Sequence, residues 1–188
     1  MTKLFAIDPG PERSAYCALF DGQIVEHDWI DNESMVLKLR NGFNAFHYVL
    51  ESPQAQDRAF GKLFRDTVIW AGRFIEAIEC RGWPLREVDE RDVRTWIVGS
   101  RTATNAALYQ ALKDYFGDTS DQPCGQCTDG QVPGKRAGTF KKCGACKGER
   151  FRRVPGTITK LNEHERSAVA AALYVWQKSA EERRSASA

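Results

Sequence analysis

The stretch LFAIDPG, residues 4–10, begins with four apolar residues and then changes abruptly at Asp8, Pro9 and Gly10. Such an apolar run predicts a strand buried in the core, and Asp8 then stands where the strand leaves it. Asp, Pro and Gly are also common turn residues, because they supply local hydrogen bonds and backbone freedom. Asp8 therefore either opens a turn only or carries a functional carboxylate.

The two segments after this turn predict a small antiparallel sheet. Residues 14–20, SAYCALF, form a second apolar run, and Asp21-Gly22 is a typical hairpin dipeptide. Residues 23–30, QIVEHDWI, alternate in polarity like a third strand. We expect three consecutive antiparallel strands, with Asp8 on the first.

Length and composition limit the class of protein. The chain has 188 residues and is 42% hydrophobic, which suffices for one core and one small accessory module. No segment resembles a signal peptide or the roughly 18 apolar residues of a membrane span, so we expect a cytoplasmic protein with no membrane partner. The net charge is only +2, so the chain as a whole is not a polycation. Any surface that binds nucleic acid is therefore expected to be local.

Residues 122–153 are locally basic. They contain eight Lys or Arg and two Asp or Glu, a balance of +6 that leaves −4 for the rest of the chain. Phe140 and Phe151 interrupt this run, which favours an arm that contacts nucleic-acid phosphates over a merely solvated basic face. The basic residues expected to bind DNA here are Lys135, Arg136, Lys141, Lys142, Lys147, Arg150, Arg152 and Arg153.

The same segment predicts a structural zinc site. Two CxxC pairs lie at the spacing typical of zinc knuckles, and four thiolates can close a tetrahedral site. The four residues are Cys124, Cys127, Cys143 and Cys146. A redox-active CxxC pair is the alternative. Cys17 and Cys80 lie in apolar segments and are expected to be buried thiols.

The rest of the chain alternates strands and helices. Residues 45–51, AFHYVLE, form a short apolar run that ends in Glu51. Apolar spacing predicts helices at 58–80, 91–98 and 104–116, and a strand at 84–88. Asn162 and Glu165 form a capping box for a final helix at 163–182. This order predicts an α/β fold in which the strands of Asp8 and Glu51 can pair side by side.

We expect this fold to be divided by the cysteine-rich segment. Residues 1–121 form the first part of the core, and the zinc-binding insertion follows at 122–153. Residues 154–182 then complete the core with the final helix, and residues 183–188 form a disordered tail.

Several motifs, in this order and spacing, resemble the RuvC family of Holliday junction resolvases. They are IDPG, YVLESPQ, WAGRFIEAIE, REVDERDVRTWIVGSRTATNAALYQAL and HERSAVAAAL, and they cover most of residues 3–178 apart from the cysteine-rich segment. The resemblance implies an RNase H-like mixed sheet flanked by helices. It also implies a homodimer in DNA recombination and repair that binds four-way DNA junctions and cuts them with Mg²⁺ or Mn²⁺.

The resemblance assigns candidate catalytic residues. Asp8 and Glu51 match the first two acidic ligands of the family. The final pair of site positions, three residues apart, falls on His164 and Ser167. Serine there departs from the expected carboxylate. Two acidic neighbours, Glu163 and Glu165, could compensate for the missing carboxylate. Their position in the first turn of a helix has another explanation, because acidic residues there favour the helix dipole and Glu165 completes the capping box.

Two further departures concern the nucleic-acid surface. The family usually has a lysine after its small-residue loop, where this chain has Thr104 and Asn105. Arg101 in the same loop is expected to contact phosphate. The cysteine-rich insertion is not general in the family and could redirect substrate preference.

The implied chemistry is phosphodiester hydrolysis with two cations about 4 Å apart. Asp8 would bridge the ions, Glu51 would hold one, and His164 would complete the other site or orient water. The competing hypothesis is a catalytically impaired protein that binds branched or single-stranded nucleic acid, which Ser167 favours. A third interpretation, protein binding through knuckles similar to those of DnaJ-type chaperones, leaves Asp8 and Glu51 unexplained.

Overall fold

The structure is a computed structural model that describes residues 2–42, 47–53, 61–117, 119–123, 128, 131–133, 140–143 and 151–186. The chain divides into two compact units. The first joins residues 1–111 to residues 161–188, and the second covers residues 112–160. The second unit thus contains the cysteine-rich segment and extends beyond it at both ends.

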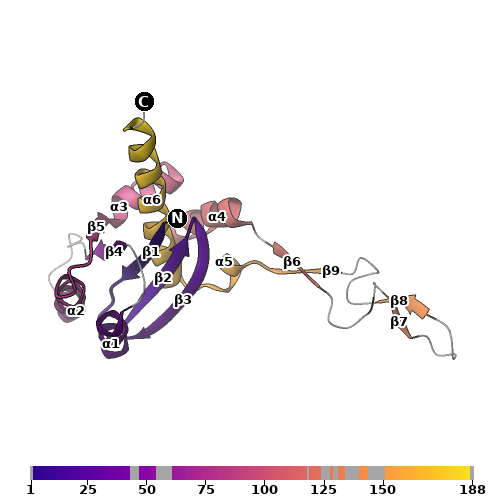
Figure 1. Ribbon diagram of the computed structural model, residues 1–188, viewed down its shortest axis with the longest axis horizontal. Helices are drawn as coiled ribbons and strands as arrows, with labels where there is room; N and C mark the ends of the chain where they lie inside the picture. The colour runs from indigo at the N-terminus through magenta and orange to yellow at the C-terminus, as the bar shows by residue number, and fades with distance from the viewer. Residues whose placement is uncertain are drawn as a thin grey trace. The chain divides into compact units, whose positions relative to one another are not determined.

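The first unit is built on a five-stranded mixed sheet with the order β3-β2-β1-β4-β5 (Figure 1). The predicted antiparallel trio is confirmed as β1 (Lys3–Asp8), β2 (Arg13–Phe20) and β3 (Gln23–Asp31). β4 (His47–Ser52) pairs with β1 in parallel, and β5 (Leu85–Asp89) pairs with β4 in parallel. β1 therefore lies at the centre of the sheet, between β2 and β4.

One face of the sheet is covered by α1 (Asn32–Asn41) and α2 (Lys62–Glu79), which lie next to each other in Figure 1. Side chains that alternate along β1 and β4 point into this layer, because successive residues of a strand face opposite sides. Those in the buried cluster with α1 and α2 are Phe5, Ile7, Tyr48 and Leu50. The alternate positions belong to the other face, and these include Asp8, directly after Ile7, and Glu51, directly after Leu50.

That other face is covered by α6 (Glu163–Ser185), which packs on β1, β2 and β4. Residues 168–173 of α6 are buried and consist of Ala and Val with one Leu, so the helix approaches the sheet closely. The predicted capping box of Asn162 and Glu165 is confirmed at its start. α6 continues to Ser185, beyond the predicted end at 182, and its last turn holds Arg183 and Arg184, which the helix dipole favours there.

Two more helices complete the first unit, α3 (Glu90–Val98) and the beginning of α4 (Asn105–Phe116). Asp89 caps α3 by accepting a hydrogen bond from the Arg91 N–H at 2.7 Å. α3 packs on β5 and α6, so its first turn lies near the start of α6. These helices fall where apolar spacing predicts them. α1 was not predicted from the sequence.

In the part of the second unit that the structure describes, the end of α4 is followed by two pairs of short strands and by a short helix, α5 (Thr157–Lys160). β6 (Thr119–Pro123) pairs with β9 (Phe151–Pro155), and β7 (Gln131–Pro133) pairs with β8 (Phe140–Lys142). Of the four predicted zinc ligands, Cys143 is described and is buried directly after β8. The other three lie outside the described residues: Cys124, Cys127 and Cys146.

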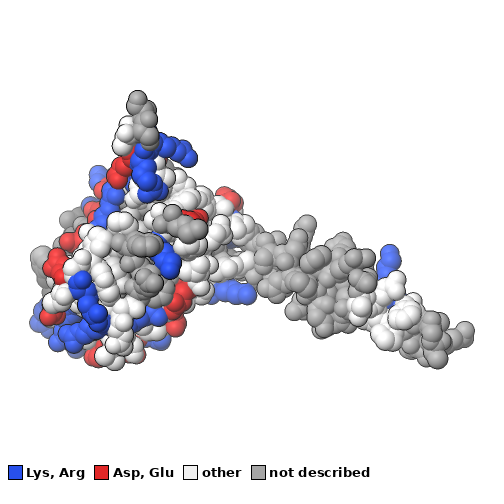
Figure 2. Space-filling model, in the orientation of Figure 1, with Lys and Arg blue, Asp and Glu red and all other residues white. Residues whose placement is uncertain are grey.

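The basic residues of this segment divide in the same way. Lys141 and Lys142 on β8 are exposed, and Figure 2 shows basic side chains at the surface there. Arg152 and Arg153 belong to β9, of which the backbone is described. The remaining predicted DNA contacts lie outside the described residues: Lys135, Arg136, Lys147 and Arg150.

The prediction that both other cysteines are buried is half correct. Cys17 is fully buried in β2, whereas Cys80 is exposed. The reason is its position at the C-cap of α2, where the chain turns into solvent. Separately, none of the helices within the described ranges is long and apolar enough to cross a membrane.

Candidate active site

Asp8 and Glu51 occupy equivalent positions on two neighbouring parallel strands. Ile7 of β1 is in register with Leu50 of β4. The next residue on each strand, Asp8 on β1 and Glu51 on β4, therefore lies beside the other. Asp8 is the last residue of β1, and Glu51 is the penultimate residue of β4. Both side chains therefore point to the face that α6 covers, as the strand pattern predicts.

His164 joins these carboxylates from the first turn of α6. Its Nδ1 atom lies 3.0 Å from the Asp8 Oδ2 atom. The imidazole also stacks on the Trp29 ring of β3, with 6.2 Å between ring centroids and 14° between planes. The Arg13 guanidinium lies over the Trp29 ring, 4.0 Å from its centroid. His164 is thus held by a hydrogen bond and by an aromatic contact.

Burial raises the pKa values of both carboxyls. Removal from water is the main reason that the pKa of Asp8 lies above its ordinary value, although the hydrogen bond from His164 opposes this rise. The pKa of Glu51 is raised well above its ordinary value by burial and then by the charge of Asp8. The hydrogen bond to Asp8 raises the pKa of His164. Both carboxyls therefore ionise less readily than in water, and a cation bound beside them would favour their charged forms.

A cavity of about 200 Å³ brings most of the predicted site residues together. Asp8, Glu51, His164, Ser167 and Glu163 all line it. Glu163 is largely exposed, with a side-chain exposure of 61%, and its Oε1 atom lies 3.9 Å from the His164 Nε2 atom. These five residues come from three elements that are distant in the sequence.

Glu165, the last tentative metal ligand predicted, does not line this cavity. Its carboxylate accepts a hydrogen bond from the Asn162 N–H at 2.9 Å and lies 2.8 Å from the His27 Nδ1 atom. Glu165 is buried with these two partners, so its carboxylate closes the capping box and contacts β3.

Three residues that sequence reasoning missed complete the wall of the cavity: Glu90, Arg94 and Asn105. The Arg94 Nε and Nη1 atoms donate to the Glu90 carboxylate and the Ala103 carbonyl, each at 2.7 Å. Its Nη2 atom donates to the Asn105 side chain at 2.7 Å, and the Asn105 amide donates to Glu163 at 3.1 Å. The four-residue spacing of Glu90 and Arg94 is visible in the sequence, but it indicates only an ordinary helical ion pair.

The donor set fits a hard divalent cation held by few protein ligands. Asp8 and Glu51 offer carboxylate oxygens, which Mg²⁺ prefers, and Mg²⁺ normally keeps several waters. Within the described ranges, the structure contains no group of three or more His, Cys, Asp or Glu placed to enclose a metal ion. The two carboxylates could hold such an ion together with waters.

Comparison with known proteins identifies the fold. No protein-family model and no curated protein matches the sequence. Among solved structures, that of Thermus thermophilus RuvC has a TM-score of 0.59 and 14% identity, over 96% of this chain and 97% of the other. The structure of T. thermophilus RuvC in complex with Holliday junction substrate gives a TM-score of 0.57 and 14% identity, over 95% and 97%. The chain thus shares the mixed α/β fold of RuvC, as its sequence motifs predict.

Proposed function

We propose that this protein is a divalent-metal-dependent endonuclease that cleaves branched DNA, with four-way Holliday junctions as its main substrate. The observation that carries the proposal is the pairing of Asp8 and Glu51 on adjacent strands, with His164 bonded to Asp8, inside a fold shared with RuvC. The neighbouring structure in complex with a Holliday junction supports the choice of substrate.

In this proposal Asp8 and Glu51 hold Mg²⁺ or Mn²⁺. When bound, the metal would activate water for attack on the phosphodiester and stabilise the charge of the leaving oxygen. His164 positions Asp8 through its Nδ1 atom, while its Nε2 atom faces the side of the cavity where Glu163 lies. The bonds of Arg94 to Glu90 and Asn105 hold the wall of the cavity in place.

The second candidate function is nucleic-acid binding without cleavage. Ser167 favours it, because a hydroxyl group stands in the cavity where the RuvC pattern has an acidic ligand. Both hypotheses predict junction binding, and they differ in whether metal-dependent cleavage follows.

Three further properties belong to the proposal. A homodimer is supported by apolar side chains exposed on α1 and α2, namely Leu37, Leu63, Val68 and Ile69. A structural Zn²⁺ at the four cysteines is supported by their spacing and by the burial of Cys143. A DNA-contacting role for the second unit is supported by its basic balance and by the exposure of Lys141 and Lys142.

The deciding experiment incubates purified protein with labelled four-way, flap and linear DNA in Mg²⁺, Mn²⁺ or chelator. We expect paired cuts in the four-way junction that require a metal. Asp8→Asn should reduce cleavage at least about 100-fold, while junction binding survives. Asp66→Asn on α2, on the opposite face of the sheet, is the matched control and should cleave like the wild type. Tight junction binding without metal-dependent cutting would replace the nuclease by the binding protein.

A further inference from the structure

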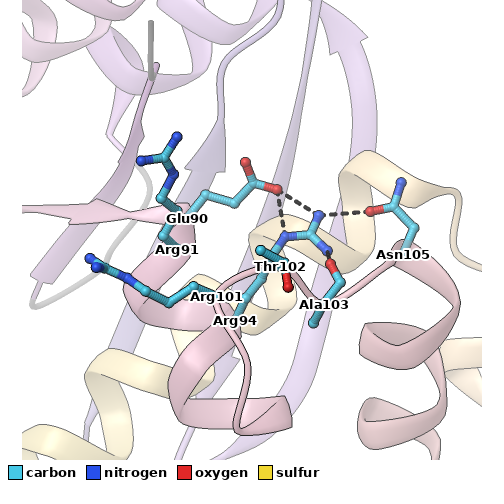
Figure 3. Close-up of a pocket in the computed structure, with 7 residues that line it drawn as sticks. All are labelled: Glu90, Arg91, Arg94, Arg101, Thr102, Ala103 and Asn105. Atoms are coloured by element: carbon cyan, nitrogen blue, oxygen red, sulfur yellow. Dashed lines mark hydrogen bonds and ion pairs between the residues drawn. The ribbon is translucent and has the colours of Figure 1, made fainter. Parts of the chain in front are cut away.

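A second cavity adjoins the carboxylate site. Its volume is about 350 Å³, and it shares three wall residues with the carboxylate cavity: Glu90, Arg94 and Asn105. Its remaining side chains are those of Arg91 and Arg101, with Thr102 and Ala103 between α3 and α4. Figure 3 shows the Arg91 and Arg101 side chains extending to the same side, away from the bonded group of Glu90, Arg94 and Asn105.

The charge of this cavity selects an anion. Three arginines and one glutamate line it, and Glu90 is already paired with Arg94. A positive excess therefore remains on Arg91 and Arg101. The lining offers little apolar surface, because apart from Ala103 all of its residues are polar or charged. Guanidinium groups match the oxygens of phosphate groups with paired hydrogen bonds.

Of the three arginines, Arg94 is held in the wall of the cavity, whereas Arg91 and Arg101 are available to bind a ligand. Arg94 is nearly buried, with a side-chain exposure of 11%, and its three nitrogens are bonded to Glu90, Ala103 and Asn105. Arg101 is 67% exposed and pairs with Asp92 only at 3.6 Å, so this contact is weak and easily exchanged. Arg91 makes no bond to the other residues drawn in Figure 3.

We infer that this arginine-lined cavity binds a phosphodiester group of the substrate strand next to the one that is cut. The inference rests on the proposed function for the identity of the substrate. The shared wall means that a strand with one phosphate at Asp8 and Glu51 continues past Arg94 into the arginine cavity. Arg91 and Arg101 contact the phosphate, and Arg94 is a positioning residue that holds the wall between the two cavities.

The test replaces the two available arginines and measures junction binding in chelator. The Arg91→Gln/Arg101→Gln double variant should reduce the slope of log affinity against log salt by about 0.9, the value for one phosphate contact, and each single variant should lose part of that amount. Arg65→Gln is the matched control, because Arg65 is also 67% exposed and pairs with Asp66 at the same 3.6 Å. It lies on α2 and should leave the slope unchanged.

Chemical substitution of the DNA then locates the contact. Single methylphosphonates, which remove one phosphate charge, are scanned across the positions around the branch point. In the wild type we expect weakened binding at one or two positions, and the Arg91→Gln/Arg101→Gln double variant should be insensitive at those positions. Inorganic phosphate, compared with chloride at equal ionic strength, should compete with DNA more strongly for the wild type than for the double variant. Phosphate competition without any methylphosphonate effect would assign the cavity to free phosphate and overturn the inference.

The outcomes separate this inference from the proposed function. Identical salt slopes and methylphosphonate patterns in wild type and double variant overturn the phosphate site, even if the protein cleaves junctions. A wild type that cuts no DNA, but shows the expected difference in pattern, fails as a nuclease and keeps the phosphate site. Thermal melting checks folding, and both arginines are exposed, so their replacement should leave the melting temperature nearly unchanged.

Discussion

The His164 Nδ1 atom lies 3.0 Å from the Asp8 Oδ2 atom, although the two residues are 156 positions apart in the sequence. This contact joins the first turn of α6 to the end of the central strand β1. Burial disfavours the ionised form of Asp8. The hydrogen bond from the imidazole acts in the opposite direction, because it stabilises the carboxylate. The same bond, with the Trp29 ring, holds the imidazole in the cavity.

Glu51→Gln should stabilise the metal-free protein. The pKa of Glu51 is raised in the folded state, chiefly by burial, so its contribution to stability is full below the ordinary carboxyl pKa and is lost as pH rises through the raised value. At pH 7 the variant should therefore melt about 2–4 °C higher, the shift that ~1 kcal/mol produces in a chain of this size. The gain should shrink towards pH 4.

Calorimetry with and without Mg²⁺ checks this prediction. Mg²⁺ should raise the melting temperature of the wild type more than that of Glu51→Gln, because the variant lacks one carboxylate ligand. Glu76→Gln, an exposed change on α2, is the control and should show neither effect. Equal responses of wild type and Glu51→Gln to Mg²⁺ would contradict a metal-binding role for Glu51.

His164→Ala should slow cleavage by about 10- to 100-fold, because it removes the hydrogen bond that positions Asp8. It should also change the preference between Mg²⁺ and Mn²⁺ if the imidazole Nε2 atom contributes to the metal site, since an imidazole nitrogen suits Mn²⁺ better. Trp29→Leu should cause a smaller loss because it removes only the stacking contact, and Trp29→Phe should restore most of the rate. Single-turnover cleavage in each metal provides the measurement. An unchanged rate and metal preference in His164→Ala would exclude His164 from the site.

Ser167→Asp should increase metal-dependent activity several-fold if the natural site lacks one ligand. Ser167 lines the carboxylate cavity, so an added carboxylate increases its attraction for a cation. The same charge should lower the stability of the metal-free protein, because Asp8 and Glu51 are already poorly solvated. Cleavage assays and melting curves report the two effects. Ser185→Asp, at the far end of α6, is the control, and activity equal to wild type in Ser167→Asp would argue against an incomplete site.

The zinc prediction is tested on the full chain purified without chelator. Elemental analysis should find one Zn²⁺ per chain, because a four-thiolate site has an apparent binding energy on the order of 10 to 16 kcal/mol. Cys143→Ser should lose the metal and accelerate hydrogen exchange in residues 112–160, while residues of the five-stranded sheet keep their protection. Cys80→Ser, at an exposed cysteine of the first unit, should keep both properties. A zinc-free wild type would overturn the site.

Lys141 and Lys142 provide a separate test of the second unit as a DNA-binding arm. Both are exposed on β8, and their joint replacement by Ala should reduce the salt dependence of junction binding by about two phosphate contacts. Lys62→Ala with Arg65→Ala on α2 removes the same charge from the first unit and should have little effect. Salt titrations by fluorescence anisotropy measure the slopes. An unchanged slope would mean that the two lysines belong to a solvated basic surface that does not contact DNA.

The fold was largely predictable where its signals are local. Asp21-Gly22 is a hairpin signal between an apolar run and an alternating strand, so the paired residues lie close together in the sequence. The capping box of Asn162 and Glu165 is local for the same reason. α1 was missed because only three of its residues, Asn32, Met35 and Leu39, are buried, which leaves a weak helical pattern. Its packing on α2 decides its position.

The candidate site divides differently. Asp8 and Glu51 could be selected as candidates from the sequence, because each carboxylate ends or nearly ends an apolar strand. The motif resemblance added His164 and Ser167 to the set. Glu90, Arg94 and Asn105 escaped prediction, because their bonds link the starts of α3 and α4 and continue to Glu163 on α6. The sequence left open whether Glu165 reaches the site, and the structure directs its carboxylate to the Asn162 N–H and to His27.

The sequence by itself determined the strands, most of the helices and the presence of acidic residues at strand ends, because hydrophobic period, turn residues and caps act over a few neighbouring positions. Only the tertiary structure decided which side chains share a cavity. Burial raises the pKa values of Asp8 and Glu51, and that burial exists only when α6 covers the face of the sheet to which both point. The arginine-lined cavity likewise exists only where α3 and the start of α4 meet, and its charge depends on Glu90 engaging Arg94 rather than its neighbours.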